Sequence, residues 1–265
     1  MFQAILLGII QGVTEFLPIS STAHLILAPW IFGWDDPGLA FDVVLHLGTL
    51  TGIIAFFWKD FYSMLQGMFS GMTVRKTDAG IEGMVGWYII IGTIPAGLAG
   101  LFLKDQIETV LRSPRIIAVS LIVFGLILLW AEVSGKKKRR MDLLNIIDAI
   151  VIGCAQAVAL IPGVSRSGIT ITAGLFRNLE RATAARFAFL LSTPIIMAGG
   201  LLSAVDVYKE GLPHDMFWPF VAGFAASAVS GFIAIKYLLL FLSKRKVNVF
   251  VYYRIIVGIL ILLMR

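Results

Sequence analysis

Residues 1–34 read MFQAILLGIIQGVTEFLPISSTAHLILAPWIFGW, an apolar stretch that is interrupted at Pro18-Ile19-Ser20-Ser21-Thr22. A single helix of that length would extend about 51 Å, whereas the hydrocarbon core of a bilayer is about 30 Å thick. The pieces on either side of the interruption would extend only about 24 and 20 Å, too short to cross comfortably. We therefore predict a re-entrant helical hairpin that reaches the middle of the membrane and returns.

A second apolar stretch of the same length, 143–176, is interrupted at Pro162-Gly163-Val164-Ser165-Arg166-Ser167. Irregular backbone at mid-membrane depth is tolerated only where protein or a water-filled cavity satisfies its N–H and C=O groups. Two hairpin tips at that depth therefore predict a cavity between them.

The composition excludes most other classes of protein. Residues of the types AVILMFWYC make up 58% of the 265 residues, a further 26 are glycine, and only 14% are charged. Soluble domains are about 45–50% apolar with glycine included, and about 25% charged. This balance excludes water-soluble enzymes, nucleic-acid binders and disordered tails. The single cysteine, Cys154, excludes an internal disulfide and a cysteine-based zinc site.

Further uncharged or nearly uncharged stretches predict membrane-spanning helices. They lie at about 39–58, 84–103, 116–131, 187–205, 216–235 and 247–264. The predicted fold is thus an all-α integral membrane protein with six transmembrane helices and two re-entrant helical hairpins.

The two halves of the chain resemble each other. Glycines follow Trp87 at offsets of 5 and 13, and they follow Trp218 at the same two offsets. Gln11 and Gln156 each precede one of the proline-serine interruptions. We predict two repeats, 1–135 and 143–265, joined by a basic linker at 136–142 within one structural domain. Three crossings in each repeat require the second to be inverted relative to the first.

The basic residues predict the orientation. One side carries thirteen of them: Lys59, Arg75, Lys76, Lys136, Lys137, Lys138, Arg139, Arg140, Arg177, Arg181, Lys244, Arg245 and Lys246. The other side carries five: Lys104, Arg112, Arg115, Lys209 and Arg265. Because cytoplasmic loops retain Lys and Arg, we place the linker in the cytoplasm and both termini outside.

Ionisable and polar groups inside the hairpins are functional candidates, because such groups are costly in a membrane. In the first hairpin, Gln11 and Glu15 lie one helical turn apart, and Ser21 and His24 follow the interruption. The second hairpin adds a guanidinium flanked by hydroxyls, at Ser165, Arg166, Ser167 and Thr170. Helix N-termini restarting after each interruption would add free N–H groups. Together these groups favour a bound anion, and an arginine fork suits phosphate.

Structural roles compete with these functional ones. Ser20 and Ser21 are also typical helix N-caps, Glu15 could pair with Arg166 only to hold the fold, and His24 could be a packing residue. Three further predictions concern other polar groups. His46 and Asp42 form a structural hydrogen-bonded pair, His214 lies in a loop, and Arg186 and Arg254 extend to the membrane interface.

The segments QGVTEFLPISSTAH at 11–24 and PGVSRSGIT at 162–170 resemble the two signature motifs of the undecaprenyl-diphosphate phosphatases, the bacitracin-resistance family. The resemblance extends over the whole chain in length, span count and repeat arrangement. The family pattern allows Glu or Gln where this chain has Gln11. Ala23 stands where many members carry glycine, a difference that we expect to matter little.

This resemblance implies that the chain hydrolyses a C55 polyprenyl diphosphate to the monophosphate carrier used in peptidoglycan synthesis. It implies catalytic roles for Glu15, Ser21, His24 and Arg166, and dependence on a divalent cation, Mg²⁺ or alternatively Ca²⁺. Magnesium is usually held by one or two carboxylates plus phosphate oxygens, so Glu15, with Gln11 beside it, is the expected metal site. The phosphate-binding residues that we expect are Ser20, Thr22, Ser165, Arg166, Ser167 and Thr170.

The sequence leaves the attacking group open between Ser21, His24 and activated water. A lipid-phosphate transporter or flippase would need the same anion site and stands as the rival function. The expected partners are the polyprenyl diphosphate and the bacterial inner membrane, with no nucleic acid; a homodimer is one open alternative. The site is expected to open to the outer face.

Overall fold

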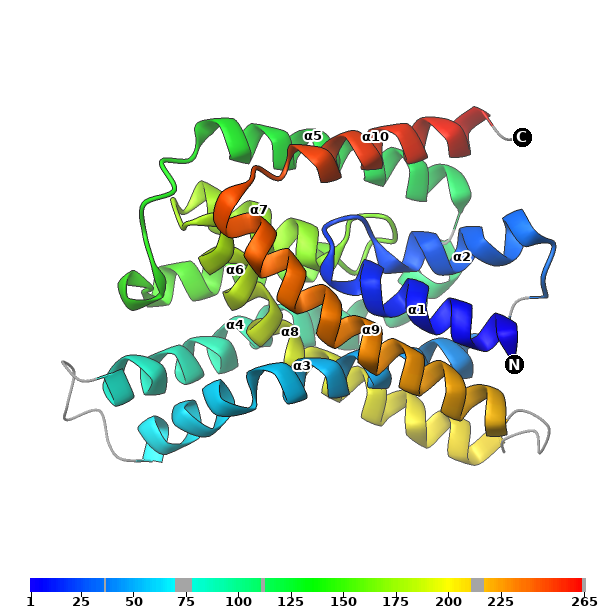
Figure 1. Ribbon diagram of the computed structural model, residues 1–265, viewed down its shortest axis with the longest axis horizontal. Helices are drawn as coiled ribbons and strands as arrows, with labels where there is room; N and C mark the ends of the chain where they lie inside the picture. Colours follow the sequence, from blue (N-terminus) through cyan, green and yellow to red (C-terminus); the bar gives the residue numbers. More distant parts are fainter. Residues whose placement is uncertain (36, 70–77, 111–112, 211–216, 264–265) are drawn as a thin grey trace.

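A computed structural model describes residues 1–35, 37–69, 78–110, 113–210 and 217–263, and this part of the chain is almost entirely helical (Figure 1). His214 lies outside the described residues. The elements in chain order are α1 (Phe2–Phe16), α2 (Ser21–Phe32), α3 (Leu39–Phe69), α4 (Asp78–Val110), α5 (Pro114–Ser134), η1 (Met141–Leu143), α6 (Ile146–Val158), α7 (Arg166–Phe176), α8 (Arg181–Glu210), α9 (Phe217–Lys244) and α10 (Asn248–Leu263).

Five of these helices are long and apolar enough to cross a membrane, which confirms a multi-pass helical membrane protein. Their apolar stretches are Ala40–Phe69, Gly80–Phe102, Pro114–Ser134, Arg181–Leu201 and Phe217–Lys244, and each overlaps a predicted span. The sixth predicted span corresponds to α10, which has 16 residues and is shorter than the other five. Many large apolar side chains on the outside of the molecule are exposed, as a lipid-facing surface requires.

Both predicted interruptions are confirmed as breaks between two short helices. Helix α1 ends before Pro18, because proline disfavours the helical conformation of Leu17, which is extended at φ −65° and ψ 139°. In each hairpin the residue before the second helix is a serine with positive φ, Ser20 at 74° and Ser165 at 71°. A non-glycine residue in that region carries backbone strain, which is typical of functional sites.

Glycines bring the first helix of each hairpin into close contact with a long helix of the other half. A Cβ atom on Gly8 of α1 would lie 2.5 Å from the carbonyl oxygen of Gly223 in α9. A Cβ atom on Gly153 of α6 would lie 2.2 Å from the carbonyl oxygen of Gly92 in α4. Only glycine permits this approach, and Gly92 and Gly223 are the residues that follow Trp87 and Trp218 at the same offset.

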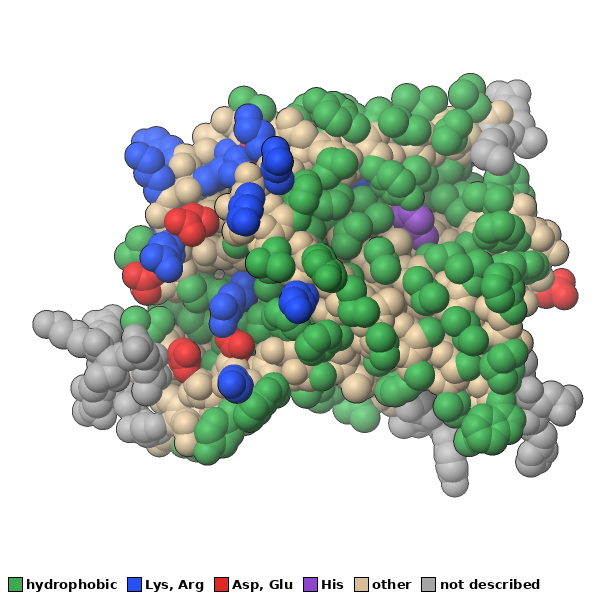
Figure 2. Space-filling model, viewed as in Figure 1, with side chains coloured by type: hydrophobic (Ala, Val, Ile, Leu, Met, Phe, Trp, Pro, Cys, Tyr) green, Lys and Arg blue, Asp and Glu red, His purple; other side chains and the backbone are tan. Residues whose placement is uncertain are grey.

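The basic linker is held against the second hairpin. Arg139 donates two hydrogen bonds to the buried Asp148 of α6, and its own backbone N–H donates to the carbonyl of Asn178. Arg181 of α8 forms a bidentate pair with Glu132 of α5. Lys and Arg side chains gather at one end of the face drawn in Figure 2, whereas both termini lie at the other end (Figure 1).

Candidate active site

The two hairpin breaks enclose a cavity of about 250 Å³. Its polar walls are Glu15, Ser20, Ser21, Thr22, Ser165 and Arg166 from the two breaks, with His46 from α3. The rest of its lining is the backbone and apolar side chains of 159–163. Residues that are about 150 positions apart in the sequence therefore meet in one polar pocket inside an apolar bundle.

Glu15 is the centre of the hydrogen bonding in this pocket. Its carboxylate is almost completely buried, and one oxygen, Oε1, accepts a 2.8 Å bond from the guanidinium of Arg166. The other oxygen, Oε2, accepts bonds from Ser21 Oγ at 2.6 Å and from Gln11 Nε2 at 3.0 Å. Glu15 therefore makes the pair with Arg166 that its structural role would require, and Ser21 shares the same carboxylate.

A second direct contact ties the hairpins together. Ser167 Oγ, at the start of α7, donates a 3.0 Å bond to the carbonyl oxygen of Leu17, at the end of α1. Ser165 caps α7, because its hydroxyl accepts a bond from the N–H of Gly168. Ser20 occupies the corresponding position before α2 but makes no side-chain cap bond, so its hydroxyl is available to the cavity.

Arg254 of α10 contradicts the prediction that it extends to the membrane interface. It is fully buried, and its guanidinium donates to carbonyl oxygens of Pro18, Gly163 and Val164, which belong to the two breaks. Two further bonds reach Ser120 and Leu121 of α5. The prediction was wrong because five backbone acceptors replace water around the charge: three carbonyl oxygens that the breaks leave outside a helix, and two of α5.

His24 lies beside the pocket rather than in its wall. Its Nδ1 bonds the carbonyl oxygen of Ser20 at 2.7 Å, and its Nε2 bonds the hydroxyl of Tyr253 at 2.6 Å. The rings of His24 and Tyr253 are stacked with centroids 5.6 Å apart. Both ring nitrogens are thus engaged outside the Glu15 cluster, and sequence reasoning missed Tyr253, which no motif marks.

The predicted phosphate ligands divide into two groups. Ser20, Thr22, Ser165 and Arg166 line the cavity, as a phosphate site needs. The Ser167 hydroxyl is instead used on Leu17, and Thr170 Oγ1 bonds the carbonyl oxygen of Arg166 one turn earlier. The hydroxyls of Ser167 and Thr170 therefore serve the backbone around the site, and neither residue lines the cavity.

His46 is a site residue that sequence reasoning assigned only to a structural pair. Its Nδ1 does bond Asp42, through the backbone carbonyl at 2.7 Å. Its Nε2, however, lies 3.7 Å from Glu15 Oε2 and faces the cavity. The signal that could have found it is an ionisable side chain inside a predicted span, which is a functional candidate by default.

The oxygen atoms around Glu15 are compatible with a hard divalent cation. Gln11 is fully buried, and its Oε1 has no hydrogen-bond partner in the described part of the chain. That orphaned oxygen lies on the side chain that already contacts Glu15. Among the described residues no group of three or more His, Cys, Asp and Glu could hold a metal. The protein therefore offers an amide oxygen and a carboxylate, a set that substrate phosphate oxygens would complete.

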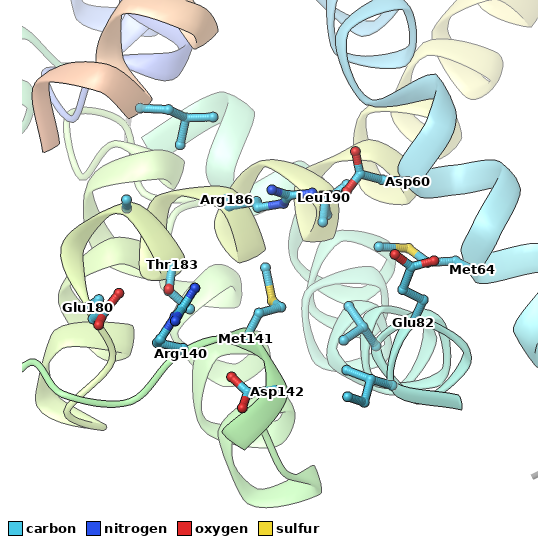
Figure 3. A pocket seen from close by; sticks show the side chains of 14 residues that line it. Asp60, Met64, Glu82, Arg140, Met141, Asp142, Glu180, Thr183, Arg186 and Leu190 are labelled. Atoms are coloured by element: carbon cyan, nitrogen blue, oxygen red, sulfur yellow. Dashed lines mark hydrogen bonds and ion pairs between the residues drawn. The ribbon is translucent and has the colours of Figure 1, made fainter. Parts of the chain in front are cut away.

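A larger cavity of about 760 Å³ lies at the linker end and contains no residue of the two motifs (Figure 3). Arg186 of α8, which we expect to extend to the interface, is exposed there and pairs with Asp60 of α3. Arg140, Asp142 and Glu180 come from the linker and its neighbourhood. The Arg186–Asp60 ion pair links α8 to α3 at this cavity, which shares no lining residue with the hairpin site.

The apolar helices and the guanidinium–carboxylate pocket define an integral membrane protein with a polar cavity between its interrupted helices. The chain belongs to the family described as bacitracin resistance protein BacA, which matches residues 4–260. It is 51% identical over 266 residues to an undecaprenyl-diphosphatase of Thermodesulfovibrio yellowstonii, covering 100% of this chain and 97% of that one. It is 48% identical over 261 residues to an undecaprenyl-diphosphatase of Moorella thermoacetica, covering 98% and 96%.

Proposed function

We propose that this protein is an undecaprenyl-diphosphatase that hydrolyses the terminal phosphate of the lipid diphosphate in the cavity between the hairpins. The names of the two relatives, both undecaprenyl-diphosphatases, support this reaction and this substrate. The observation that carries the location is the pair of contacts in which Glu15 accepts hydrogen bonds from both Ser21 and Arg166. A nucleophile, a base and an anion-binding fork thus meet in one pocket.

In the proposed mechanism Ser21 is the nucleophile. Its hydroxyl already donates to the Glu15 carboxylate at 2.6 Å, which is the geometry for general-base activation. As Glu15 takes the proton, Ser21 Oγ bonds to the terminal phosphorus, and the bond from phosphorus to the bridging oxygen breaks. Undecaprenyl phosphate leaves with that electron pair.

Water then attacks the phosphoserine, the bond between phosphorus and Ser21 Oγ breaks, and inorganic phosphate is released. Glu15 returns its proton to Ser21 Oγ, and the proton lost by the attacking water goes to solvent or phosphate. His24 has a supporting role in this scheme, because both of its ring nitrogens are engaged with Ser20 and Tyr253.

Arg166 stabilises the charge that spreads over the phosphate oxygens. Phosphoryl transfer depends mostly on positioning and electrostatic stabilisation, and a guanidinium provides paired donors for phosphate. Ser20, Thr22 and Ser165 are the remaining phosphate contacts, since their side chains or backbone face the same cavity. Glu15 and Gln11 would hold a divalent cation, expected to be Mg²⁺, which would neutralise diphosphate charge when bound.

The proposed arrangement in the membrane is two inverted repeats, 1–135 and 143–265, each a re-entrant hairpin followed by three crossings. The recurrence of the element order, the paired serines with positive φ and the matched glycine contacts support the repeat. The position of both termini opposite the basic end supports a cytoplasmic linker and a site that opens outward. The bacterial inner membrane is the expected location.

Phosphate release by the purified protein in detergent tests the function, because transport across a micelle has no meaning. We expect wild-type protein to release phosphate from a polyprenyl diphosphate when Mg²⁺ is present, and a phosphoserine to be trapped on Ser21 by rapid acid quenching. Binding of the lipid without any phosphate release would favour the flippase and would contradict the proposal.

A cysteine at position 138 tests the orientation when it is treated with a membrane-impermeant thiol reagent in intact cells. We expect Lys138→Cys to resist labelling and Asp35→Cys, near the opposite end, to react, both in a Cys154→Ala background. The reverse pattern would overturn the outward-facing site without affecting the proposed chemistry.

A further inference from the structure

An apolar groove of about 670 Å³ runs along the outside of α9 and is separate from the hairpin cavity, with which it shares no lining residue. Its walls are mostly aliphatic and aromatic: Val13, Leu17, Ile233, Ala234, Tyr237, Leu238, Leu240, Phe241 and Phe250, with Ser230. Lys244 and Arg245 complete the lining at the junction of α9 and α10. The groove is therefore apolar along its length and cationic at one end.

The groove is long enough to hold an acyl chain across one leaflet of a bilayer. Its α9 residues run from Ser230 to Lys244, about 21 Å along the helix axis, and half of a bilayer core is about 15 Å. The other end includes Leu17, whose carbonyl accepts the bond from Ser167 at the hairpin tips. The groove thus runs from the depth of the tips to the basic, linker-side surface.

The two cations at the mouth of the groove are available to a ligand. Lys244 and Arg245 are both exposed, and within the described chain neither side chain forms an ion pair. Other basic residues on the same side already form ion pairs with carboxylates: Arg139 pairs with Asp148, and Arg181 pairs with Glu132. Unpaired basic side chains beside an acyl-sized groove complement an anionic head group.

We propose that this groove binds an anionic phospholipid of the linker-side leaflet, with its phosphate on Lys244 and Arg245 and an acyl chain along α9. The charge lies at the wrong end for the enzyme's own substrate, whose diphosphate would occupy the hairpin cavity at the opposite end of the groove. The lipid also contacts α1 on either side of Glu15, through Val13 and Leu17, and its binding stabilises the folded chain.

Native mass spectrometry of the full chain in detergent, titrated with phosphatidylglycerol or with phosphatidylcholine of the same acyl chains, tests the proposal. We expect one preferred phosphatidylglycerol on the wild type. Lys244→Gln with Arg245→Gln should bind it about 30-fold more weakly, the loss expected for two basic residues at an anionic head group. The matched control, Lys136→Gln with Lys138→Gln, removes the same charge from exposed linker positions and should bind normally.

Ile233→Trp tests the acyl part of the site. Ile233 lines the groove and is 47% exposed, so a tryptophan fills the groove without entering the core. Phosphatidylglycerol binding should fall although both cations remain. Retained binding in this variant, equal binding of phosphatidylcholine to the wild type, or an equal loss in the linker control would overturn the proposal. Phosphate release from a short isoprenyl diphosphate is the control for folding. We expect it to be unchanged in every variant.

Discussion

The two hairpin breaks share a backbone design but carry different chemistry. Each one ends a short helix, turns through a serine with φ near 70° and restarts a helix at the cavity. The first break presents the nucleophile candidate Ser21 beside the carboxylate of Glu15, whereas the second presents the guanidinium of Arg166. In the proposed mechanism the first break thus supplies the acid–base groups and the second supplies the guanidinium that binds phosphate, and neither break is complete alone.

Arg254 fixes the two breaks relative to each other, because its guanidinium donates hydrogen bonds to both of them. It donates to Pro18 of the first and to Gly163 and Val164 of the second. The peptide N–H groups that follow these carbonyls point the opposite way in a trans peptide, so the guanidinium also fixes their direction. Substitutions can therefore test this comparison at the first break, at the second break, or at Arg254, which joins them.

The largest loss of activity is expected from substitutions at the first break. Ser21→Ala and Glu15→Gln should each lower kcat by about 10³-fold, since a positioned base contributes 10²–10⁴. The double variant should lose little more, because residues that act as one unit are strongly non-additive. Phosphate release at saturating Mg²⁺ measures all three. Ser20→Ala is the comparison variant: Ser20 lines the same cavity without contacting Glu15, so only one phosphate hydrogen bond is lost and kcat should fall by about 10-fold. Additive losses would separate Ser21 from Glu15.

At the second break, Arg166→Lys should lower kcat by about 10²–10³-fold, nearly as much as Arg166→Ala. Lysine keeps the charge but loses the paired donors that engage Glu15 and phosphate. The matched control is Arg177→Lys in the same repeat, where the side chain pairs with Asp148 near the linker and the activity should be unchanged. A fully active Arg166→Lys would contradict the bidentate role.

At Arg254, which joins the two breaks, Arg254→Ala should lower kcat by about 10²-fold and also lower the melting temperature, because three carbonyl oxygens of the breaks lose their donor. Millimolar guanidinium should restore part of the activity by entering the cavity that the side chain leaves, whereas urea at the same concentration should not. Wild-type turnover in a folded Arg254→Ala would show that the breaks keep their positions without it.

Much of this architecture could be predicted from the sequence. The two breaks, five of the spans and the meeting of Glu15, Ser21 and Arg166 follow from apolar run lengths, prolines and the cost of burying polar groups. These are local signals, and the membrane makes them strong because it leaves few alternatives for an apolar run.

The contacts made by α3 and α10 could not be predicted in the same way. His46 and Tyr253 reach the site only through the tertiary packing of helices that carry no motif, and Arg254 looks like an interfacial residue until its acceptors are known. Those acceptors are backbone carbonyls, and a sequence does not show which backbone carbonyls lie near a given side chain. The finer division of the predicted phosphate ligands, with Ser167 and Thr170 used on the backbone, likewise depends on side-chain direction.

The smallest expected effect compares the two strained serines directly. Glycine adopts positive φ without the Cβ penalty, so Ser20→Gly should raise the unfolding free energy by about 1 kcal/mol, because Ser20 makes no cap bond that would be lost. Ser165→Gly relieves the same strain but removes the hydroxyl that accepts from Gly168 N–H and contacts Ser167 Oγ at 3.2 Å. Its net change should be near zero. Thermal unfolding in detergent measures both, and equal changes would mean that the Ser165 cap contributes nothing to stability.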